Sequence, residues 1–109
     1  MVTLPSYEGD MSILKNHISI ITFLRPGIIK VQKNEGNSEE FFVQDGTAEF
    51  FNDNLVLLSS SAINVKDLSK DLIDNLSKDT KNQLNQKNIT DHDRYVLNHK
   101  LDTLKEIRV

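Results

Sequence analysis

Three histidines, His17, His92 and His99, are the side chains of this sequence best suited to binding a metal ion or exchanging a proton near neutral pH. His92 and His99 are seven residues apart, so on a helix they would share one face. Helical metal ligands are usually three or four residues apart, and a third ligand would have to come from elsewhere. Acidic side chains are expected in the first turn of a helix, so we interpret Asp91-His92-Asp93 as a solvated helix start.

A set of acid, base and nucleophile cannot be assembled from this sequence. His17 would need a positioned partner to act as a general base, and the sequence identifies none. The triplet Ser59-Ser60-Ser61 lacks the glycines of a nucleophile elbow and is typical of a polar linker. Neither a Walker loop nor a dinucleotide-binding glycine motif occurs. The absence of cysteine excludes thiolate zinc sites and a cysteine nucleophile. We therefore expect no catalytic residue, no metal and no cofactor.

The composition limits the size and the partners of the protein. The chain has 109 residues, of which 38% are hydrophobic and 27% charged, and a mean hydropathy of −0.41. This length suits one domain, or one small domain with an appendage. The net charge of −3 argues against a general nucleic-acid binder. Apolar runs stay well short of a membrane span, and the first residues do not form a signal peptide, so we expect no membrane insertion.

The two halves of the chain differ in composition. All five Phe and all four Gly lie at or before residue 51, whereas Lys, Asp, Asn and Leu dominate after residue 62. This break predicts two modules, a β-sandwich domain over residues 1–61 and a helical hairpin over residues 62–109. The fold class is then an all-β N-terminal sandwich or flattened barrel followed by a C-terminal antiparallel α-helical hairpin.

The first half alternates short β-branched or aromatic runs with turn residues. Pro26-Gly27 predicts a type II turn with a positive φ at Gly27, and Asp45-Gly46 is the strongest hairpin signal in the chain. Such short strands suggest a sandwich or flattened barrel, or an open meander that needs another surface to cover one face. The expected strands span residues 2–4, 18–24, 28–33, 40–44, 47–51 and 55–59.

The second half has helical periodicity. One apolar stripe comprises Val65, Leu68, Leu72, Leu76 and Leu84, with Asn64 as the expected cap of its helix. Thr90 is expected to cap a second helix with Asp91 and Asp93 in its first turn. The stripe of the second helix is Leu97, Leu101, Leu104 and Ile107. Both stripes are narrow, so we expect an antiparallel hairpin that is marginal alone and needs a partner surface.

The ordered set of residues in the first half resembles the ε subunit of F-type ATP synthase, called δ in mitochondria. The resemblance extends more weakly through the helical end, and the fold of that family agrees with the two modules inferred above. The motifs that carry it are Glu8-Gly9…Ile13-Leu14…His17, Leu24-x-Pro26-Gly27-x-Ile29, Glu39-Glu40-Phe41-x-Val43…Gly46-x-x-Glu49, Asn54-x-Val56-x-Leu58 and Leu104…Arg108-Val109.

This resemblance implies a non-catalytic rotor subunit that binds the foot of the γ shaft and the polar loops of the membrane c-ring. It would lie peripherally at the cytoplasmic face of the bacterial inner membrane. The acidic loop of Glu8, Gly9 and Asp10 matches the loop that faces the c-ring. His17 and Thr22 match positions on the side that touches γ.

In that family the hairpin can fold against the sandwich or extend along γ toward the α/β head. The extended form blocks ATP hydrolysis, helped by basic side chains that meet an acidic segment of β. Residues 94–109 carry four basic side chains against two acidic ones. We take Arg94, Lys105 and Arg108 as candidates for this contact, although cations near a helix C-terminus are also favoured by the helix dipole alone.

Several positions depart from the family pattern. Ser12, Lys15 and Asp45 stand where Gly, Pro and Gly are usual. The nucleotide motif Leu-Asp-x-x-Arg-Ala is replaced by residues 68–73, which lack its Asp and Arg, so we expect no tight ATP binding. The sequence begins within what would be the second strand, which predicts an exposed sheet edge and self-association there. The alternative function is a free-standing β-sandwich ligand-binding module with a helical dimerisation hairpin.

Overall fold

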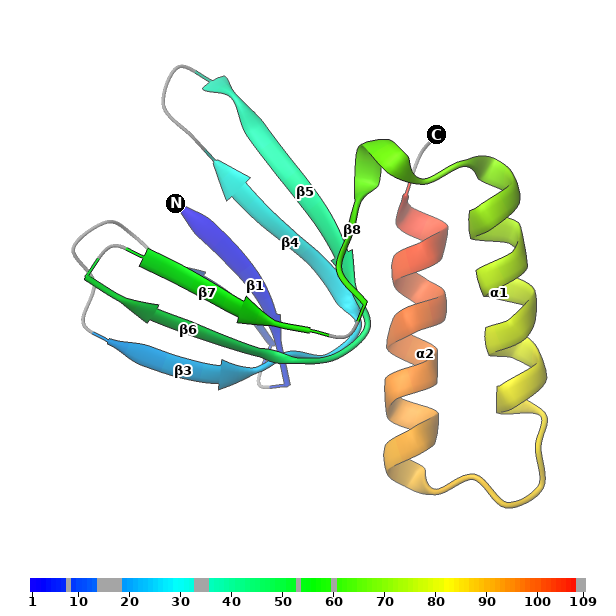
Figure 1. Cartoon of the computed structure of the whole chain (residues 1–109). Coiled ribbons are helices and arrows are strands. Elements are labelled where there is room, and N and C mark those ends of the chain that lie inside the picture. Colours follow the sequence, from blue (N-terminus) through cyan, green and yellow to red (C-terminus); the bar gives the residue numbers. More distant parts are fainter. Residues whose placement is uncertain (8, 14–18, 33–35, 53, 60, 108–109) are drawn as a thin grey trace.

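A computed structural model describes the chain except residues 8, 14–18, 33–35, 53, 60 and 108–109. In the described part of the chain, eight strands form a sandwich, and two helices stand beside it as an antiparallel pair (Figure 1). The elements are β1 (Val2–Ser6), β2 (Gly9–Ile13), β3 (Ile20–Phe23), β4 (Gly27–Gln32), β5 (Ser38–Val43), β6 (Thr47–Phe51), β7 (Asn54–Leu58), β8 (Ile63–Asn64), the 3-10 turn η2 (Val65–Asp67), α1 (Lys70–Leu84) and α2 (Asp91–Glu106). The predicted fold class is confirmed.

The strands form one sheet of five and one sheet of three. Their spatial orders are β2-β1-β4-β5-β8 and β3-β6-β7, and every pairing is antiparallel. The side chains that face each other between the two sheets form the main core, which is Leu4, Ile13, Leu24, Ile29, Val43, Ala48 and Phe50. Because side chains alternate along a strand, the five-stranded sheet has a second face, and that face packs against the helices.

Phe42 is the centre of this second contact. It is fully buried and pairs across the sheet with Ile28 and Ile63, so all three side chains point away from the sandwich core. Leu104 of α2 and Ile73 of α1 pack on Phe42 together with Leu68. The expectation that the hairpin needs a partner surface is met by the protein's own sandwich.

Two predicted strand pairings are wrong. Asp45-Gly46 joins β5 to β6, and Pro26-Gly27 follows β3 and begins β4, but in both cases the two strands belong to different sheets. Gly46 has a φ of 128°, and its carbonyl accepts the Leu24 amide at 2.8 Å, so it forms a corner between the sheets. Glycine also fits there because a Cβ would collide with the Leu58 carbonyl.

The predicted positive φ at Gly27 is also wrong, because Gly27 is not among the positive-φ residues and lies within β4. Glycine is needed there for a different reason. A Cβ on Gly27 would overlap the side chain of Pro5 in β1, the neighbouring strand. The residue type therefore permits close packing of two strands.

The first helix begins later than expected. Asn64 caps the short turn η2, and Ser69 caps α1 by accepting the amide of Leu72 at 3.1 Å. Because residues 68–69 separate η2 from α1, the side that α1 turns toward the sandwich is not the one expected for a single helix running from Val65. Ile73 is therefore buried and Leu72 is 37% exposed. The prediction that Leu72 lies on the buried stripe is wrong for this reason.

The second helix follows the prediction at its start. Thr90 accepts the amide of Asp93 at 3.0 Å, and Asp93 accepts the amide of Thr90 at 3.4 Å, so the two residues form a complete capping box. Leu104 is the most buried residue of the predicted stripe, and Ile107 packs partly buried beside it. Of the helices in the described part of the chain, none has the length and apolar character to cross a bilayer.

Candidate functional site

The outer face of the three-stranded sheet is unusually apolar. Ile21 and Phe23 of β3 are each 68% exposed, and Leu58 of β7 is 69% exposed. Phe51 and Val56 add to the same surface, and Glu49 lies in its middle. We call Ile21, Phe23, Phe51, Val56 and Leu58 the apolar face.

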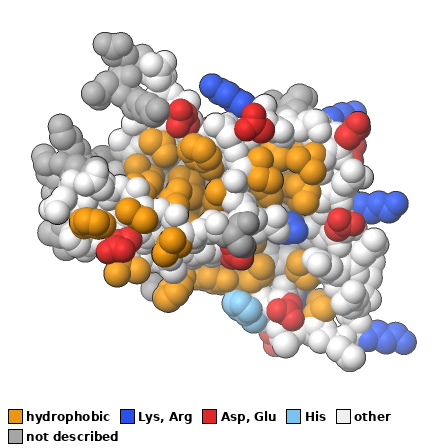
Figure 2. All heavy atoms as spheres, viewed as in Figure 1, with side chains coloured by type: hydrophobic (Ala, Val, Ile, Leu, Met, Phe, Trp, Pro, Cys, Tyr) orange, Lys and Arg blue, Asp and Glu red, His pale blue; other side chains and the backbone are white. Residues whose placement is uncertain are grey.

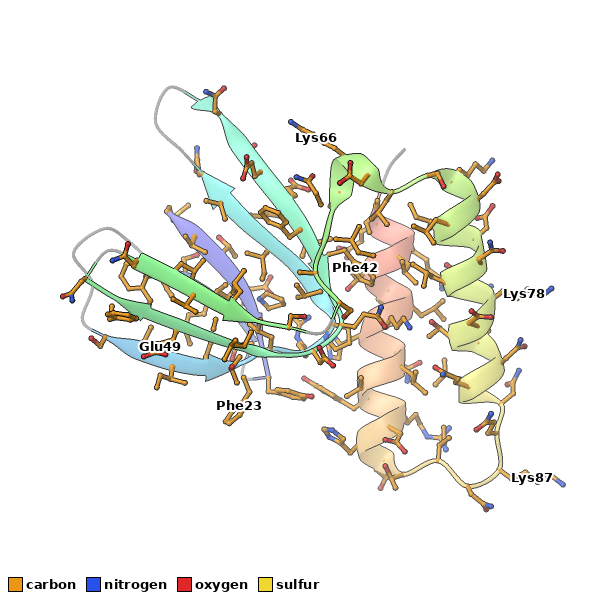
Figure 3. All side chains as sticks on the ribbon, in the orientation of Figure 1. Phe23, Phe42, Glu49, Lys66, Lys78 and Lys87 are labelled. Carbon is orange, nitrogen blue, oxygen red and sulfur yellow. The ribbon has the colours of Figure 1, made fainter. Side chains whose placement is uncertain are left out.

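The strand register places four of these five side chains in two rows, and Phe51 lies opposite Asn54 beyond them. Ile21, Glu49 and Val56 form one row, and Phe23, Thr47 and Leu58 form the next. Figure 3 shows Phe23 projecting away from the sheet. In the view of Figure 2, hydrophobic side chains gather over the sandwich, while Lys and Arg side chains stand out along the hairpin side. Contiguous exposed apolar surface of this kind marks a contact with another macromolecule.

The sequence contained a signal for this face that we did not use. In residues 20–23 three of the four side chains are apolar, and Ile20 and Ile21 stand next to each other instead of alternating with polar residues. A strand with one face in a core and the other in water should alternate. Consecutive apolar residues on an edge strand therefore indicate that both of its faces need cover.

Of the two residues expected on the γ side, the structure describes Thr22. His17 lies outside the described residues. Thr22 belongs to β3, but its side chain points away from the apolar face, and its hydroxyl donates to Ser6 Oγ at 3.3 Å. Thr22 therefore stabilises the strand that carries Ile21 and Phe23 and does not itself form part of their surface.

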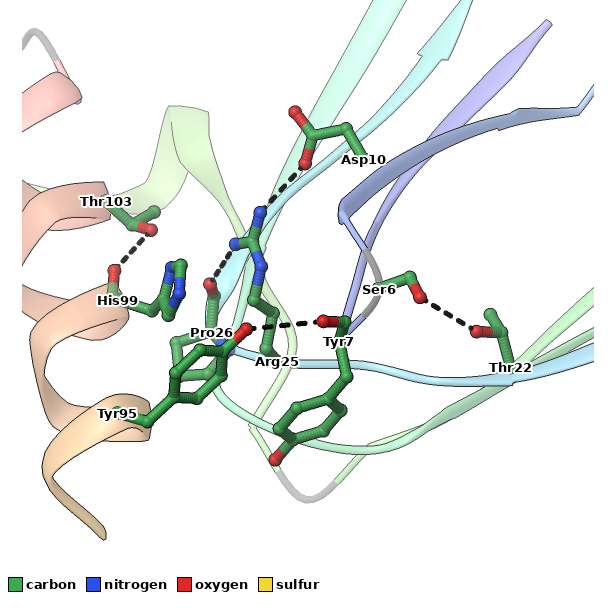
Figure 4. Close-up of polar contacts among 9 residues, drawn as sticks. All are labelled: Ser6, Tyr7, Asp10, Thr22, Arg25, Pro26, Tyr95, His99 and Thr103. Carbon is green, nitrogen blue, oxygen red and sulfur yellow. Dashed lines mark hydrogen bonds and ion pairs between the residues drawn. The ribbon is translucent and has the colours of Figure 1, made fainter. Parts of the chain in front are cut away.

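The turn between β1 and β2 carries the residues expected on the c-ring side. Glu8 lies outside the described residues, and Gly9 opens β2 with a φ of 116°. The Asp10 side chain is 70% exposed and accepts a charge-assisted hydrogen bond from Arg25 Nη2 at 3.0 Å. Arg25 also donates to the carbonyl of Pro26 at 3.0 Å, which fixes the guanidinium beside the turn (Figure 4).

Two of the three basic candidates, Arg94 and Lys105, lie on the solvent side of α2. Arg94 is in its first turn and Lys105 in its last turn, and both are exposed. Eleven helical residues make almost a whole number of turns, so the two cations lie on one side of α2, about 16 Å apart along its axis. This side differs from the one that carries the buried Leu104 and Thr103. Arg108 lies outside the described residues.

A cavity of about 610 Å³ separates α2 from the sandwich. Its charged walls mix cations and anions, so it is not suited to one strongly charged ligand. In the residues that the structure describes, no group of three or more His, Asp or Glu side chains could hold a metal ion. The charged groups that line the cavity are Asp10, Arg25, Lys30, Glu40, His99, Asp102 and Glu106.

Four rings connect α2 to the β1–β2 turn. Tyr7 stacks on both His92 and Tyr95 with centroids 5.9 Å apart, and Tyr95 meets His99 edge to face at 4.4 Å. Tyr95 Oη also donates to the Tyr7 carbonyl at 3.3 Å (Figure 4). We call Tyr7, His92, Tyr95 and His99 the aromatic strip. The shared helical face of His92 and His99 was visible in the sequence, but its packing against Tyr7 was not.

Comparison with known proteins gives consistent matches. A family model described as the beta-sandwich domain of the ATP synthase delta/epsilon chain matches residues 1–65. The ATP synthase epsilon chain of Pelagibacter ubique is 44% identical over 106 residues, which cover 97% of this chain and 81% of that protein. The epsilon chain of Parvibaculum lavamentivorans is 35% identical over 109 residues, covering 99% of this chain and 81% of the relative.

Among solved structures, this fold resembles a chain of the Euglena gracilis mitochondrial ATP synthase assembly of OSCP, F1 and c-ring. The TM-score is 0.70 at 16% sequence identity, and the match covers 95% of this chain. It spans 64% of the solved chain, which is therefore longer than the part matched. At this identity the likeness establishes the shared fold.

Proposed function

The chain belongs to the delta/epsilon family of ATP synthase and is a central-stalk subunit, and on that premise we propose that it acts as a non-catalytic adaptor between the γ shaft and the c-ring. The apolar face is the observation that carries this proposal. An adaptor of this kind needs an apolar surface that excludes water when it binds γ. It also needs a second, more polar surface that can contact the loops of the c-ring.

The apolar face is the proposed contact with γ. It presents the rings of Phe23 and Phe51, and aromatic side chains are enriched in the buried centres of interfaces, while its branched side chains add apolar area. β7 pairs only with β6 among the described strands, so the apolar face continues to an open strand edge. His17 remains a candidate for this side of the sandwich, whereas Thr22 acts on it only through the strand that it stabilises.

The β1–β2 turn is the proposed contact with the c-ring. Gly9 and Asp10 are exposed, and Glu8 precedes them. Their acidity suits polar loops that carry basic or hydrogen-bond-donating groups. Through these two contacts the protein would lie peripherally at the cytoplasmic face of the inner membrane.

The hairpin is the proposed regulatory element. Folded as in this structure it rests on the sandwich, and when extended along γ it would bring Arg94, Lys105 and Arg108 to an acidic segment of β in the α/β head. Each partner surface biases the equilibrium between the two arrangements by its differential affinity. We infer that the extended hairpin restrains ATP hydrolysis.

Tight nucleotide binding is not part of this proposal. Residues 68–73 contain no arginine, and the aspartate at position 71 does not stand where the family motif has one. Lys70 and Asp71 are both exposed at the start of α1. A bidentate guanidinium contact with a phosphate is therefore unavailable from this segment.

A binding measurement with purified γ tests the adaptor proposal. We expect the intact chain to bind γ with a Kd in the micromolar range or tighter. Phe23→Ser should weaken binding at least about tenfold because it removes the more exposed of the two rings of the apolar face. Lys78→Ser, on the exposed side of α1 (Figure 3), is the matched control and should leave the Kd unchanged. Absence of binding by the intact chain, or equal Kd values for the two variants, would refute the proposal.

A second measurement tests the regulatory role separately. The double variant Arg94→Ala/Lys105→Ala should inhibit ATP hydrolysis by the α/β/γ assembly less than the unmodified chain does. Lys78→Ala controls for the loss of a surface cation. Equal inhibition by all three proteins would contradict the role of the basic side chains without affecting the binding of γ.

A further inference from the structure

The hairpin is held on the sandwich by a small contact. The buried apolar part consists of Phe42, Leu68, Ile73 and Leu104, with partly buried neighbours. The rest of the contact is the polar cavity of about 610 Å³ and the aromatic strip. A contact with so little buried apolar surface can open without disrupting the separate core between the sheets.

His99 lies in the middle of this contact. Its ring meets Tyr95 on its own helix and lines the cavity opposite the turn between β3 and β4, which carries Arg25 (Figure 4). The side chain is half-buried, and its carbonyl accepts the Thr103 hydroxyl at 2.7 Å. The imidazole therefore lines the cavity between α2 and the sandwich while the hairpin is docked, and release of the hairpin would expose it to solvent.

Charged groups of both modules line the cavity that His99 also lines. The sandwich contributes Arg25, Asp10, Lys30 and Glu40, and α2 contributes Asp102 and Glu106. The positive charge of Arg25 disfavours protonation of the imidazole, whereas the negative charges of Asp102 and Asp10 favour it. Asp10 and Arg25 are themselves paired at 3.0 Å, so each partly offsets the effect of the other on the imidazole.

We propose that docking of the hairpin on the sandwich is sensitive to protons, with His99 as the sensing residue and Arg25 as the cation that opposes its protonation. A neutral imidazole fits the half-buried contact, whereas an imidazolium loses hydration there and stands near a second positive charge. Protonation of His99 weakens docking, and acid favours release of the hairpin.

The sign follows from linkage between proton binding and docking. Burial, and then the charge of Arg25, lower the pKa of His99 below its ordinary value of 6.5 in the docked protein. The released hairpin restores the ordinary pKa, so the released form binds more protons. Above pH 6.5 the docking equilibrium therefore does not change with pH. Below pH 6.5 docking weakens as the pH falls, until the pH reaches the pKa that His99 has in the docked protein.

This inference extends the proposed regulatory role of the hairpin. Its consequence for the assembled enzyme rests on that role. Under that role, acid would increase the population of hairpins free to reach the α/β head. The docking equilibrium itself belongs to the isolated chain. It can therefore be measured without γ, and failure of this inference would leave the binding of γ untouched.

The test uses fluorescence energy transfer within the full chain. Because the sequence has no cysteine, Glu49→Cys on β6 and Lys78→Cys on α1 give two unique labelling positions on the sandwich and the hairpin (Figure 3). A fixed urea concentration is chosen at which docked and released populations are both visible near neutral pH. We expect the docked-to-released ratio to fall at least about threefold between about pH 7.5 and about pH 5.5.

Variants assign the effect to His99. His99→Gln keeps a polar side chain that cannot titrate in this range, and it should remove most of the pH dependence. His92→Gln, at the other histidine of the aromatic strip, is the control and should keep it. Arg25→Gln should reduce it. An equal pH dependence in the unmodified chain and in His99→Gln, or tighter docking in acid, would overturn the proposal.

A direct titration covers the case in which His99→Gln fails to dock. The imidazole of His99 is followed by NMR in the unmodified chain and in Leu104→Ala, in which the hairpin is expected to be released. The pKa of His99 should be lower in the unmodified chain. An equal or higher pKa there would overturn the proposal.

Discussion

Replacing Leu104 with alanine is expected to release the hairpin while the sandwich stays folded. Leu104 is 1% exposed on α2 and packs on Phe42, Leu68 and Ile73. The change removes every carbon beyond Cβ, which costs about 2.4 kcal/mol at about 0.8 kcal/mol per buried carbon. The cavity that remains among these neighbours raises the cost to about 3–5 kcal/mol. Since 1.4 kcal/mol is a factor of ten, docking should weaken more than about 100-fold.

Amide hydrogen exchange, followed residue by residue, distinguishes the two modules. In Leu104→Ala, amides of α1 and α2 should lose protection, whereas β4 and β6 should keep theirs because the core between the sheets is untouched. Leu72→Ala is the matched control. Leu72 is 37% exposed, and alanine is the better helix former, so we expect a change of at most about 1.5 kcal/mol, well below that of Leu104→Ala. The reasoning fails if both variants behave alike, or if helices and strands lose protection together.

Three further outcomes follow from local contacts. Gly27→Ala should lower the free energy of unfolding of the sandwich by about 1–3 kcal/mol, seen as a lower thermal midpoint, because its Cβ would overlap Pro5; an unchanged midpoint would contradict that contact. Thr90→Ala should cost about 1 kcal/mol and expose the first turn of α2 to hydrogen exchange, leaving strand amides unaffected. Asp10→Asn should change the free energy of unfolding by less than about 1 kcal/mol, because its ion pair with Arg25 is exposed at the carboxylate; a large fall in the urea midpoint would show that this pair holds the fold together.

Local chemistry predicted much of the fold. The strand at residues 47–51 and the cap at Thr90 were predicted at their observed positions, because both depend on neighbouring residues alone. The pairing across Asp45-Gly46 was not, because a hairpin turn and a corner between sheets use the same residue types. Which of the two forms depends on partners elsewhere in the chain, such as the Leu24 amide that donates to Gly46.

The candidate surfaces also divide into those that depend on nearby residues and those that depend on distant ones. Arg94 and Lys105 could be named from residue type and helical spacing. The aromatic strip could not, because it joins Tyr7 to Tyr95, which are 88 residues apart in sequence. The apolar face was predictable only in part. Adjacent apolar residues in β3 indicate that both faces of this strand are covered, but they do not identify the strands that lie beside β3. The predicted self-association at an open sheet edge stays a prediction, which the elution volume of the purified chain would test.

Site-specific crosslinking in the assembled ATP synthase tests the central claim most directly. The chain has no cysteine of its own, so each introduced thiol reports one position. Phe23→Cys, on the apolar face, should crosslink to γ, and Asp10→Cys, at the β1–β2 turn, should crosslink to a c subunit. Lys78→Cys should crosslink to neither while the hairpin is docked. Crosslinks of Phe23→Cys to some other subunit, or failure of the chain to enter the assembly at all, would contradict the account.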